Sequence, residues 1–178
     1  PIKSSAASDV YKRQIPILAI SGSNGKTTTK ELVSRVLAER FEVYATRGNL
    51  NNHIGVPLTL LAMTRDTEFG VVEMGASACG ELALLASVAE PNYGILTNIG
   101  LAHLEGFGGV EGVRRGKGEL YDYLAANGGR AFVRRDDGTL VKMAAERGNL
   151  AVELYDPAIA DGVGHRLEGC LLYTSPSP

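Results

Sequence analysis

Residues 22–28 read Gly22-Ser23-Asn24-Gly25-Lys26-Thr27-Thr28, and the apolar run Ile15-Pro-Ile-Leu-Ala-Ile20 precedes them with only Ser21 between. A strand, a glycine-rich turn and a Gly-Lys-Thr sequence at a helix start place backbone N–H groups, an ammonium and a hydroxyl around one small volume. That arrangement suits a polyphosphate with Mg²⁺. The segment therefore predicts a nucleoside triphosphate site built from residues 22–28.

The spacing of this loop differs from that of the common P-loop. The chain matches G-x-x-G-K-T, which is two residues shorter than G-x-x-x-x-G-K-[ST]. A strand-to-helix turn without a ligand is the alternative interpretation. The first turn of a helix favours acidic residues rather than lysine, which supports the phosphate site. The helix expected over residues 26–40 carries one apolar stripe, made of Leu32, Val33, Val36 and Leu37.

Length and composition are those of a soluble globular domain. The chain has 178 residues, of which 44% are hydrophobic and 21% charged, with a formal net charge of −2. Because there is no broad basic field, we expect no nucleic-acid partner. Cys79 and Cys170 lie far apart and form no metal-binding or disulfide pattern. No apolar run approaches the ~18 residues that cross a bilayer, so we expect a cytoplasmic protein without membrane insertion.

The two ends of the chain differ from its middle. Residues 1–14 are polar without periodicity, and residues 170–178 close on a Ser/Pro cluster. Both resemble translated adapter or vector sequence. We therefore expect non-native or disordered tails at residues 1–14 and 170–178, with one domain at residues 15–169.

Between these ends, short β-type runs alternate with helical patterns. We expect strands at residues 17–21, 41–45, 69–72, 93–97, 130–133 and 150–154. We expect helices at residues 26–40, 56–63, 80–89, 110–126 and 138–147. This alternation predicts an α/β fold, a P-loop nucleotide-binding domain whose mostly parallel sheet has helices on both faces.

Polar side chains follow three of the expected strands, and ligands of such sheets gather at the carboxyl ends of the strands. Lys26 and Thr27 follow the first strand, Glu73 ends the third, and His103 comes after the fourth. We expect these side chains to face one triphosphate-magnesium pocket. Lys26 would pair with the β and γ phosphates, and Thr27 and Glu73 would supply oxygens to Mg²⁺.

Several of these residues also have an ordinary structural interpretation. Glu73 would otherwise cap backbone amides, and His103 would be a hydrogen-bonded structural histidine, since imidazole is an unusual partner for Mg²⁺. Lys117 alone is interpreted as a solvated surface lysine. The loop at residues 46–57 contains turn residues, but on this edge its amides would equally orient a second substrate. Those amides are Asn49, Asn51 and Asn52.

Taken together, these segments resemble the central ATPase domain of the Mur ligases, from about residue 17 to residue 156. Several motifs occur in the family's order, which makes a chance resemblance improbable. They span residues 21–30, 48–60, 72–76, 96–100 and 102–108, with Lys117-Gly-Glu119.

The resemblance implies an enzyme and assigns roles to its residues. The sequence Asn49-Leu-Asn-Asn-His-Ile-Gly-Val-Pro57 resembles the member that adds D-alanyl-D-alanine to UDP-N-acetylmuramoyl-tripeptide in peptidoglycan synthesis. The implied reaction uses ATP and Mg²⁺ to convert a carboxylate to an acyl phosphate, which an amine then attacks. The resemblance also implies that Glu73 and His103 are metal ligands. Lys117 would match a lysine that many relatives carry as a carbamate, an adduct with CO₂.

The chain also departs from the family pattern. Family members have three domains, with an N-terminal domain that recognises the UDP sugar and a C-terminal domain that closes over ATP. We expect the chain to be a central domain cut before its adenine-contacting end, binding ATP poorly and ligating nothing alone. Relatives often have an asparagine before the paired acids, where this chain has Arg134-Arg135-Asp136-Asp137. The alternatives are another Mur or folylpolyglutamate-type amide ligase and a nucleotide-binding switch without ligase activity.

Overall fold

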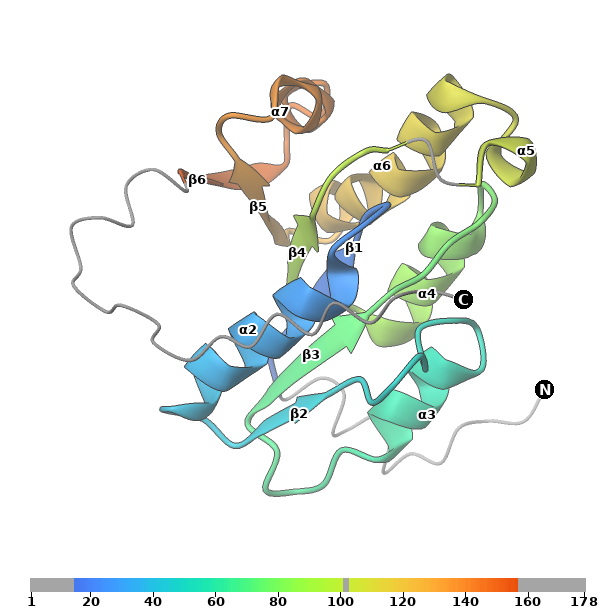
Figure 1. The fold of residues 1–178 in the computed structure, drawn as a ribbon. Helices are drawn as coiled ribbons and strands as arrows, with labels where there is room; N and C mark the ends of the chain where they lie inside the picture. The colour runs from blue at the N-terminus through green and yellow to red at the C-terminus, as the bar shows by residue number, and fades with distance from the viewer. Residues whose placement is uncertain (1–14, 101–102, 157–178) are drawn as a thin grey trace.

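The computed structural model describes residues 15–100 and 103–156. The tails expected at residues 1–14 and 170–178, and the part of the expected domain beyond residue 156, lie outside the described residues. The described strands form one parallel sheet in the order β2-β3-β1-β4-β5-β6 (Figure 1). Their bounds are β1 (Ile17–Ser21), β2 (Val43–Ala45), β3 (Phe69–Glu73), β4 (Tyr93–Leu96), β5 (Arg130–Arg134) and β6 (Ala151–Tyr155).

Helices cover both faces of this sheet. α2 lies on one side of the strands, and α3, α4 and α6 lie on the other (Figure 1). Successive residues of β1 pack on opposite faces, Ile17 with the α4 and α6 side and Leu18 with the α2 side. The helices are α2 (Lys26–Ala38), α3 (Gly55–Leu61), α4 (Glu81–Ala89), α5 (Leu104–Phe107), α6 (Val110–Ala126) and α7 (Gly138–Ala145). The expected α/β fold is confirmed.

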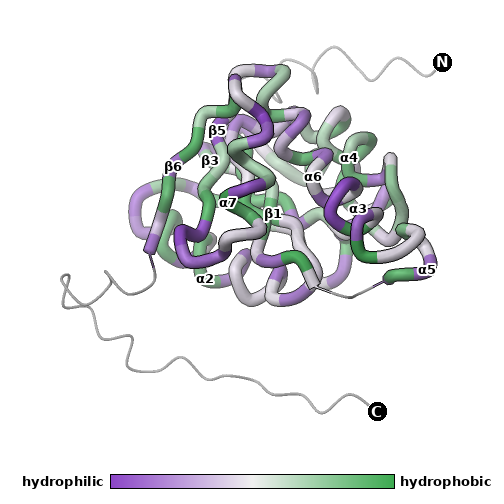
Figure 2. Tube along the Cα trace, turned by 90° about the horizontal axis from the view of Figure 1, so that it is seen from above, coloured by the Kyte–Doolittle hydropathy of each residue, from purple (hydrophilic) through white to green (hydrophobic). Residues whose placement is uncertain are grey.

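Hydrophobic residues of the central strands form the core between these helices. Ile17, Leu18, Ala19 and Ile20 of β1 are all buried, as the continuous apolar run of a doubly covered parallel strand requires. The hydrophobic colouring of these strands in Figure 2 marks the core. Among the described residues, no helix is both long and apolar enough to cross a membrane.

The expected elements are confirmed with small shifts at their ends. The strand expected from residue 41 begins at Val43, because the Phe41 N–H still donates to the Leu37 carbonyl at the end of α2 (2.9 Å). The four-residue helix α5 was not expected. Both differences arise at turns, where a single backbone hydrogen bond decides the boundary.

The apolar stripe expected on α2 is partly wrong. Val33 and Leu37 do pack against the sheet, but Leu32 and Val36 are 38% and 69% exposed. The third member of the buried face is instead Lys30, which is 1% exposed. The tight turn from β1 into α2 fixes the rotation of the helix, so the face at positions 30, 33 and 37 meets the sheet.

The register of the sheet brings the ends of its central strands together. β1 lies between β3 and β4, with Ile20 opposite Glu73 and Ser21 opposite Leu96. The glycine-rich loop, Glu73 and the segment that begins at Thr97 therefore start at the same edge. This edge carries the candidate site.

Candidate functional site

The loop between β1 and α2 has the conformation that its glycines permit. Gly22 and Gly25 have φ angles of 132° and 78°, which side-chain-bearing residues rarely adopt. A Cβ at Gly22 would overlap the Thr97 hydroxyl. The backbone thus enters α2 directly, and Lys26 is the first helical residue. Helix N-termini of this kind leave N–H groups free to bind an anion.

The segment after β4 braces this loop. The Thr97 hydroxyl donates to the Asn24 carbonyl (2.6 Å), and the Ser23 N–H donates to the Asn98 carbonyl (3.1 Å). The Gly100 N–H donates to the Ser23 hydroxyl (2.8 Å). The sequence predicted that residues 97–100 share the edge but not that they hold the loop. A Thr-Asn pair at the end of the strand beside the loop is the signal that would have suggested it.

Lys26 lies folded over the loop. Its Nζ donates to the Gly22 and Ser23 carbonyls, at 3.0 Å each. Burial lowers the pKa of Lys26, and the nearby Glu73 carboxylate opposes that shift. The ammonium therefore sits at the mouth of the loop with Glu73 as its acidic neighbour. Thr27 and Thr28 follow it in the first turn of α2, where both are exposed.

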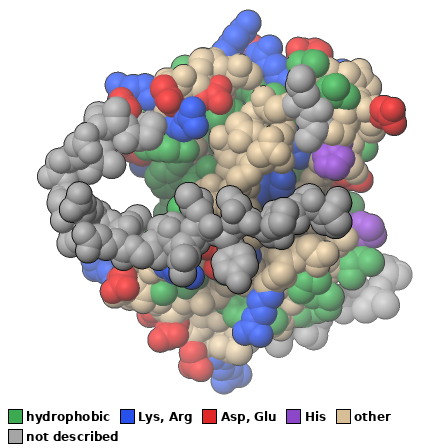
Figure 3. Space-filling view, in the orientation of Figure 1, with side chains coloured by type: hydrophobic (Ala, Val, Ile, Leu, Met, Phe, Trp, Pro, Cys, Tyr) green, Lys and Arg blue, Asp and Glu red, His purple; other side chains and the backbone are tan. Residues whose placement is uncertain are grey.

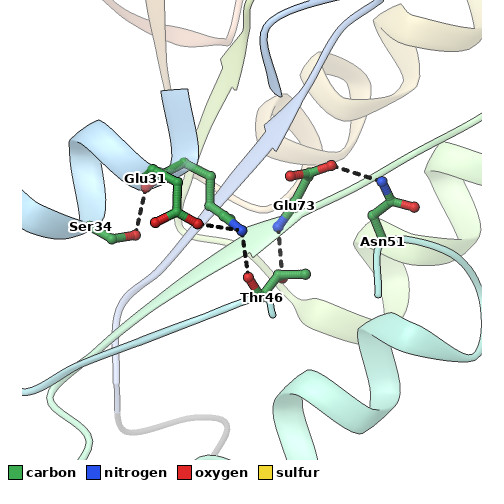
Figure 4. Close-up of polar contacts among 6 residues, drawn as sticks. Glu31, Ser34, Thr46, Asn51 and Glu73 are labelled. Carbon is green, nitrogen blue, oxygen red and sulfur yellow. Dashed lines mark hydrogen bonds and ion pairs between the residues drawn. The ribbon is translucent and has the colours of Figure 1, made fainter. Parts of the chain in front are cut away.

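Glu73 is buried at the end of β3 with one carboxylate oxygen unpaired. Its Oε1 accepts a hydrogen bond from Asn51 Nδ2 (2.8 Å), and its N–H donates to the Thr46 hydroxyl (3.0 Å), as Figure 4 shows. Oε2 has no hydrogen-bond partner. A buried carboxylate oxygen without a donor is unfavourable unless a cation or another donor reaches it. Glu73 therefore fits a site for a hard cation better than it fits the alternative of a backbone cap.

A cavity of about 560 Å³ opens beside these groups. It brings together Lys26, Asn51 and His103, and Glu73 is joined to it through Asn51. Figure 3 shows histidine side chains on a face of the molecule on which Lys or Arg atoms are also visible. The other lining residues are Asn52, His53, Gly75, Ala76, Ser77, Glu81, Leu84 and Leu85. Lys26 and His103 thus face one pocket.

The asparagines of the loop before α3 differ in what they contact. Asn51 holds Glu73, and its carbonyl accepts from the Gly75 N–H (2.7 Å). The Asn52 side chain accepts from the Ile54 and Gly55 N–H groups at the start of α3. Asn49 is exposed and does not line the cavity. Substrate contacts by the three asparagines stay predictions.

His103 occupies an unusual backbone position. It precedes α5 with a φ of 58°, one of two residues other than glycine with positive φ in the described part of the chain. Strain of this kind persists only where the surroundings impose it, and it is concentrated at functional sites. His103 is exposed and lines the pocket. Its role as a metal ligand stays a prediction.

Lys117 is not a solvated surface lysine, and that interpretation is wrong. It is 2% exposed, because α6 packs against α4 and turns Lys117 inward. Its Nζ donates to the Ala76 carbonyl (2.8 Å) and lies 5.3 Å from the centre of the Phe107 ring. Burial, with a smaller contribution from Lys26, lowers the pKa of Lys117 to about 8, against the opposing effect of Glu81 and Glu119. The Lys117 amine therefore loses its proton at lower pH than an exposed lysine does.

The acids near Lys117 are engaged at the start of α4. Glu119 Oε1 accepts from the Gly80 N–H (2.6 Å) and its Oε2 from the Ala83 N–H (2.9 Å). Glu81 Oε2 accepts from the Ser77 N–H (2.6 Å), and this bond is the main cause of the lowered pKa of Glu81. The sequence did not single out Glu81. These bonds fix the wall of the cavity at residues 76–81.

No three His, Cys, Asp or Glu side chains come together as a metal cage within residues 15–100 and 103–156. A closed zinc-type site needs such a set. Mg²⁺ is held differently, through one or two carboxylates together with phosphate oxygens and water. A single buried carboxylate, Glu73, near the Lys26 ammonium of the glycine-rich loop fits the second case.

Comparisons with known proteins agree with this geometry. The family model described as "Mur ligase middle domain" matches residues 20–161. The UDP-N-acetylmuramoyl-tripeptide–D-alanyl-D-alanine ligase of Bacillus subtilis (strain 168) is 46% identical over 112 residues, 63% of this chain and 24% of that protein. The protein of the same name from Escherichia coli (strain K12) is 37% identical over 152 residues, 84% of this chain and 33% of that protein.

Solved structures give the same result. A crystal structure of MurF from Acinetobacter baumannii superposes with a TM-score of 0.76 at 33% identity, covering 83% of this chain and 32% of that one. MurF ligase from Thermotoga maritima, in complex with ADP, superposes with a TM-score of 0.72 at 30% identity, covering 86% of this chain and 37% of that one. The chain thus spans between about a quarter and a third of the curated relatives quoted above, at 24% and 33%.

Proposed function

Since the chain belongs to the Mur ligase family, we propose that it is the ATP-binding middle part of a ligase that joins D-alanyl-D-alanine to UDP-N-acetylmuramoyl-tripeptide. The names of its relatives support this substrate pair. The observation that carries the proposal is the shared edge of the sheet, where Lys26 and Asn51 line one cavity and Asn51 holds Glu73, whose second carboxylate oxygen is unpaired. The remaining domains of the parent ligase would supply the contacts to the UDP sugar and the amino substrate.

The residues of the loop would bind and orient ATP. The N–H groups at the start of α2 and the Lys26 ammonium would hold the phosphates, as they do in nucleotide sites of this type, while the Ser23 and Asn24 N–H groups donate to Asn98 and fix the loop. Glu73 and Thr27, with His103 nearby, would hold Mg²⁺, which when bound supplies positive charge to the phosphates. Lys26 suits this role, because the nearby Glu73 carboxylate opposes the lowering of its pKa by burial and so favours the charged ammonium.

The reaction then needs little chemistry from side chains. The terminal carboxylate of the tripeptide attacks the γ-phosphorus of ATP, forming an acyl phosphate and ADP. The amine of D-alanyl-D-alanine attacks the acyl carbon, forming the amide and releasing phosphate and a proton. Lys26 would stabilise charge in the first step by position alone. Because the reaction consumes ATP, the proposal includes a cytoplasmic location.

The test of this function uses the full-length parent protein, assayed for phosphate release. We expect release with UDP-N-acetylmuramoyl-tripeptide and D-alanyl-D-alanine together, and background release when either is left out. Lysine or diaminopimelate in place of the dipeptide, or a folate as the carboxylate, tests the other amide ligases of the superfamily. Steady ATP hydrolysis without any carboxylate substrate would favour a nucleotide switch and overturn the proposal.

We propose that Lys117 also reacts with CO₂ to form a carbamate. The reaction needs a neutral amine, whose nitrogen attacks the carbon of CO₂ and loses a proton. A buried lysine with a pKa of about 8 supplies that amine far more readily than an exposed one. The nearby Lys26 provides positive charge that would stabilise the carbamate anion.

Carbamate formation at Lys117 should increase with pH. Because the pKa is lowered to about 8 from an ordinary 10.5, the neutral fraction rises through pH 8 instead of near 10.5. At a fixed pressure of ¹³CO₂, a carbamate ¹³C signal from the full-length protein should therefore grow between about pH 7 and pH 9. Lys117→Met removes it, and Lys142→Met, at an exposed lysine of α7, leaves it. A signal that persists in Lys117→Met would dismiss the carbamate.

A further inference from the structure

Three charged side chains are buried in the described part of the chain: Lys30, Glu73 and Lys117. Glu73 and Lys117 belong to the site proposed above. Lys30 lies one helical turn beyond Lys26, on the face of α2 that meets the sheet, and has no role in that site so far. Its side chain is only 2% exposed.

Burying an ammonium at this position is energetically unfavourable. Removing a charged group from water carries a large free-energy penalty even after the protein relaxes. A partner such as Glu31, whose side chain is 57% exposed, offsets little of that penalty. An apolar side chain beside Val33 and Leu37 would pack α2 on the sheet without that cost. The buried Lys30 ammonium therefore has a role other than packing α2 against the sheet.

The contacts of Lys30 lead to Glu73. Lys30 Nζ donates to the carbonyl of Thr46 at 2.7 Å, in the buried space where β2 ends. The hydroxyl of the same Thr46 accepts the N–H of Glu73 at 3.0 Å. Figure 4 shows this chain of contacts running from α2 through Thr46 to Glu73, with Asn51 on the far side of the carboxylate.

Thr46 is held from three directions. Besides the bonds to Lys30 and Glu73, its N–H donates to the Val71 carbonyl at 3.0 Å, which extends the pairing of β2 with β3 by one residue. The loop that carries Asn51 starts from this point. Fixing Thr46 thus fixes both the backbone of Glu73 and the base of the loop whose asparagine holds the Glu73 carboxylate.

We propose that Lys30 is a positioning residue that, through Thr46, holds Glu73 in the orientation that binds the cation accompanying the nucleotide. The inference rests on the proposed function, because it concerns the same nucleotide site. Lys30 touches neither nucleotide nor cation. Its contacts reach the Glu73 N–H through Thr46, and Glu73 Oε2 is the one buried carboxylate oxygen without a hydrogen-bond partner among the described residues.

The test measures ADP binding to the full-length protein by calorimetry, over a series of Mg²⁺ concentrations and without Mg²⁺. This measurement needs no acceptor substrate. Lys30→Met and Thr46→Val each remove one bond of the chain of contacts. We expect each to raise the Mg²⁺ concentration that gives half-maximal tightening of ADP binding by about 10-fold, with Mg²⁺-free affinity unchanged, as for loss of a group that orients a metal ligand.

Two variants serve as matched controls. Thr46→Ser keeps a hydroxyl that can accept the Glu73 N–H and should restore the wild-type dependence on Mg²⁺. Glu31→Gln removes only the exposed partner of Lys30 and should also behave as wild type. The double variant with Lys30→Met and Thr46→Val should show less than the product of the two single effects, because both substitutions break one connection.

The outcomes separate this inference from the function on which it rests. If the wild-type protein binds no ADP with or without Mg²⁺, the proposed function fails. If it binds ADP and Lys30→Met keeps the wild-type Mg²⁺ dependence, or weakens binding equally with and without Mg²⁺, the positioning role is overturned and the function stands. Should Lys30→Met fail to fold, Thr46→Val against Thr46→Ser decides by the same criterion.

Discussion

Replacing Lys26 by alanine is expected to lower kcat/KM of the full-length ligase by at least about 1000-fold, because transferred phosphoryl groups are stabilised mainly by fixed positive charge. The ammonium lies over the loop, within 3.0 Å of the Gly22 and Ser23 carbonyls, and lines the cavity. No other lysine among residues 15–100 and 103–156 lines it. The measurement is phosphate release with both substrates present.

The fold should survive this substitution. Lys26 is half-buried, and the hydrogen bonds of its ammonium go to two carbonyls of its own loop, three and four residues before it, not to the core. The thermal midpoint should therefore stay within a few degrees of wild type, as for most surface substitutions. Lys142→Ala makes the same change at an exposed lysine and should leave activity unchanged. Normal turnover by Lys26→Ala would remove this lysine from the site.

The local parts of this fold were predictable from the sequence. An apolar run, a glycine turn and a helical pattern give β1, the loop and α2, since each depends on neighbouring residues. The position of Glu73 followed as well, because the carboxyl ends of parallel strands share one edge. The comparisons confirm the family that these motifs resemble.

Burial of the lysines could not be read from local patterns. Lys117 is buried only because α6 packs on α4 and the Ala76 carbonyl accepts its hydrogen bond from 41 positions away in the sequence. Lys30 is buried because the turn at Gly25 sets the rotation of α2, which turns Leu32 and Val36 outward. Lys30 lies three residues before Val33 and seven before Leu37, a spacing that places all three on one face of a helix. Hydropathy alone nevertheless assigns a lysine to the solvent face.

The two buried lysines, Lys30 and Lys117, and the carboxylate of Glu73 are all charged groups whose burial is unfavourable for stability. A lysine that is buried without full compensation lowers stability, as does a carboxylate oxygen without a donor. All three lie within one network around the phosphate-type loop, and two of them, Lys117 and Glu73, influence the titration of Lys26 or are influenced by it. Burial of charged groups around one loop, with the cost to stability that such burial predicts, is the pattern expected of an active site.

Substitution of Glu73 by glutamine should separate stability from function. The amide oxygen can still accept the Asn51 Nδ2 bond of 2.8 Å, while the negative charge is lost and a neutral NH₂ group takes the place of the unpaired Oε2. Because the cost of burying a charge is removed together with its attraction to Lys26, the unfolding midpoint in urea should stay about the same. Turnover should fall by about 100-fold or more, the scale seen when one charge-stabilising group of a reaction centre is lost.

The activities of the wild type and Glu73→Gln are compared at several Mg²⁺ concentrations. An amide oxygen is a weaker ligand than a carboxylate for a hard cation, so added Mg²⁺ should restore part of the lost activity of Glu73→Gln. Glu39→Gln, at an exposed acid at the end of α2, controls for the general effect of losing one negative charge. A variant that is both less stable and insensitive to Mg²⁺ would mean that Glu73 serves the fold alone, since a structural carboxylate has no reason to respond to the cation.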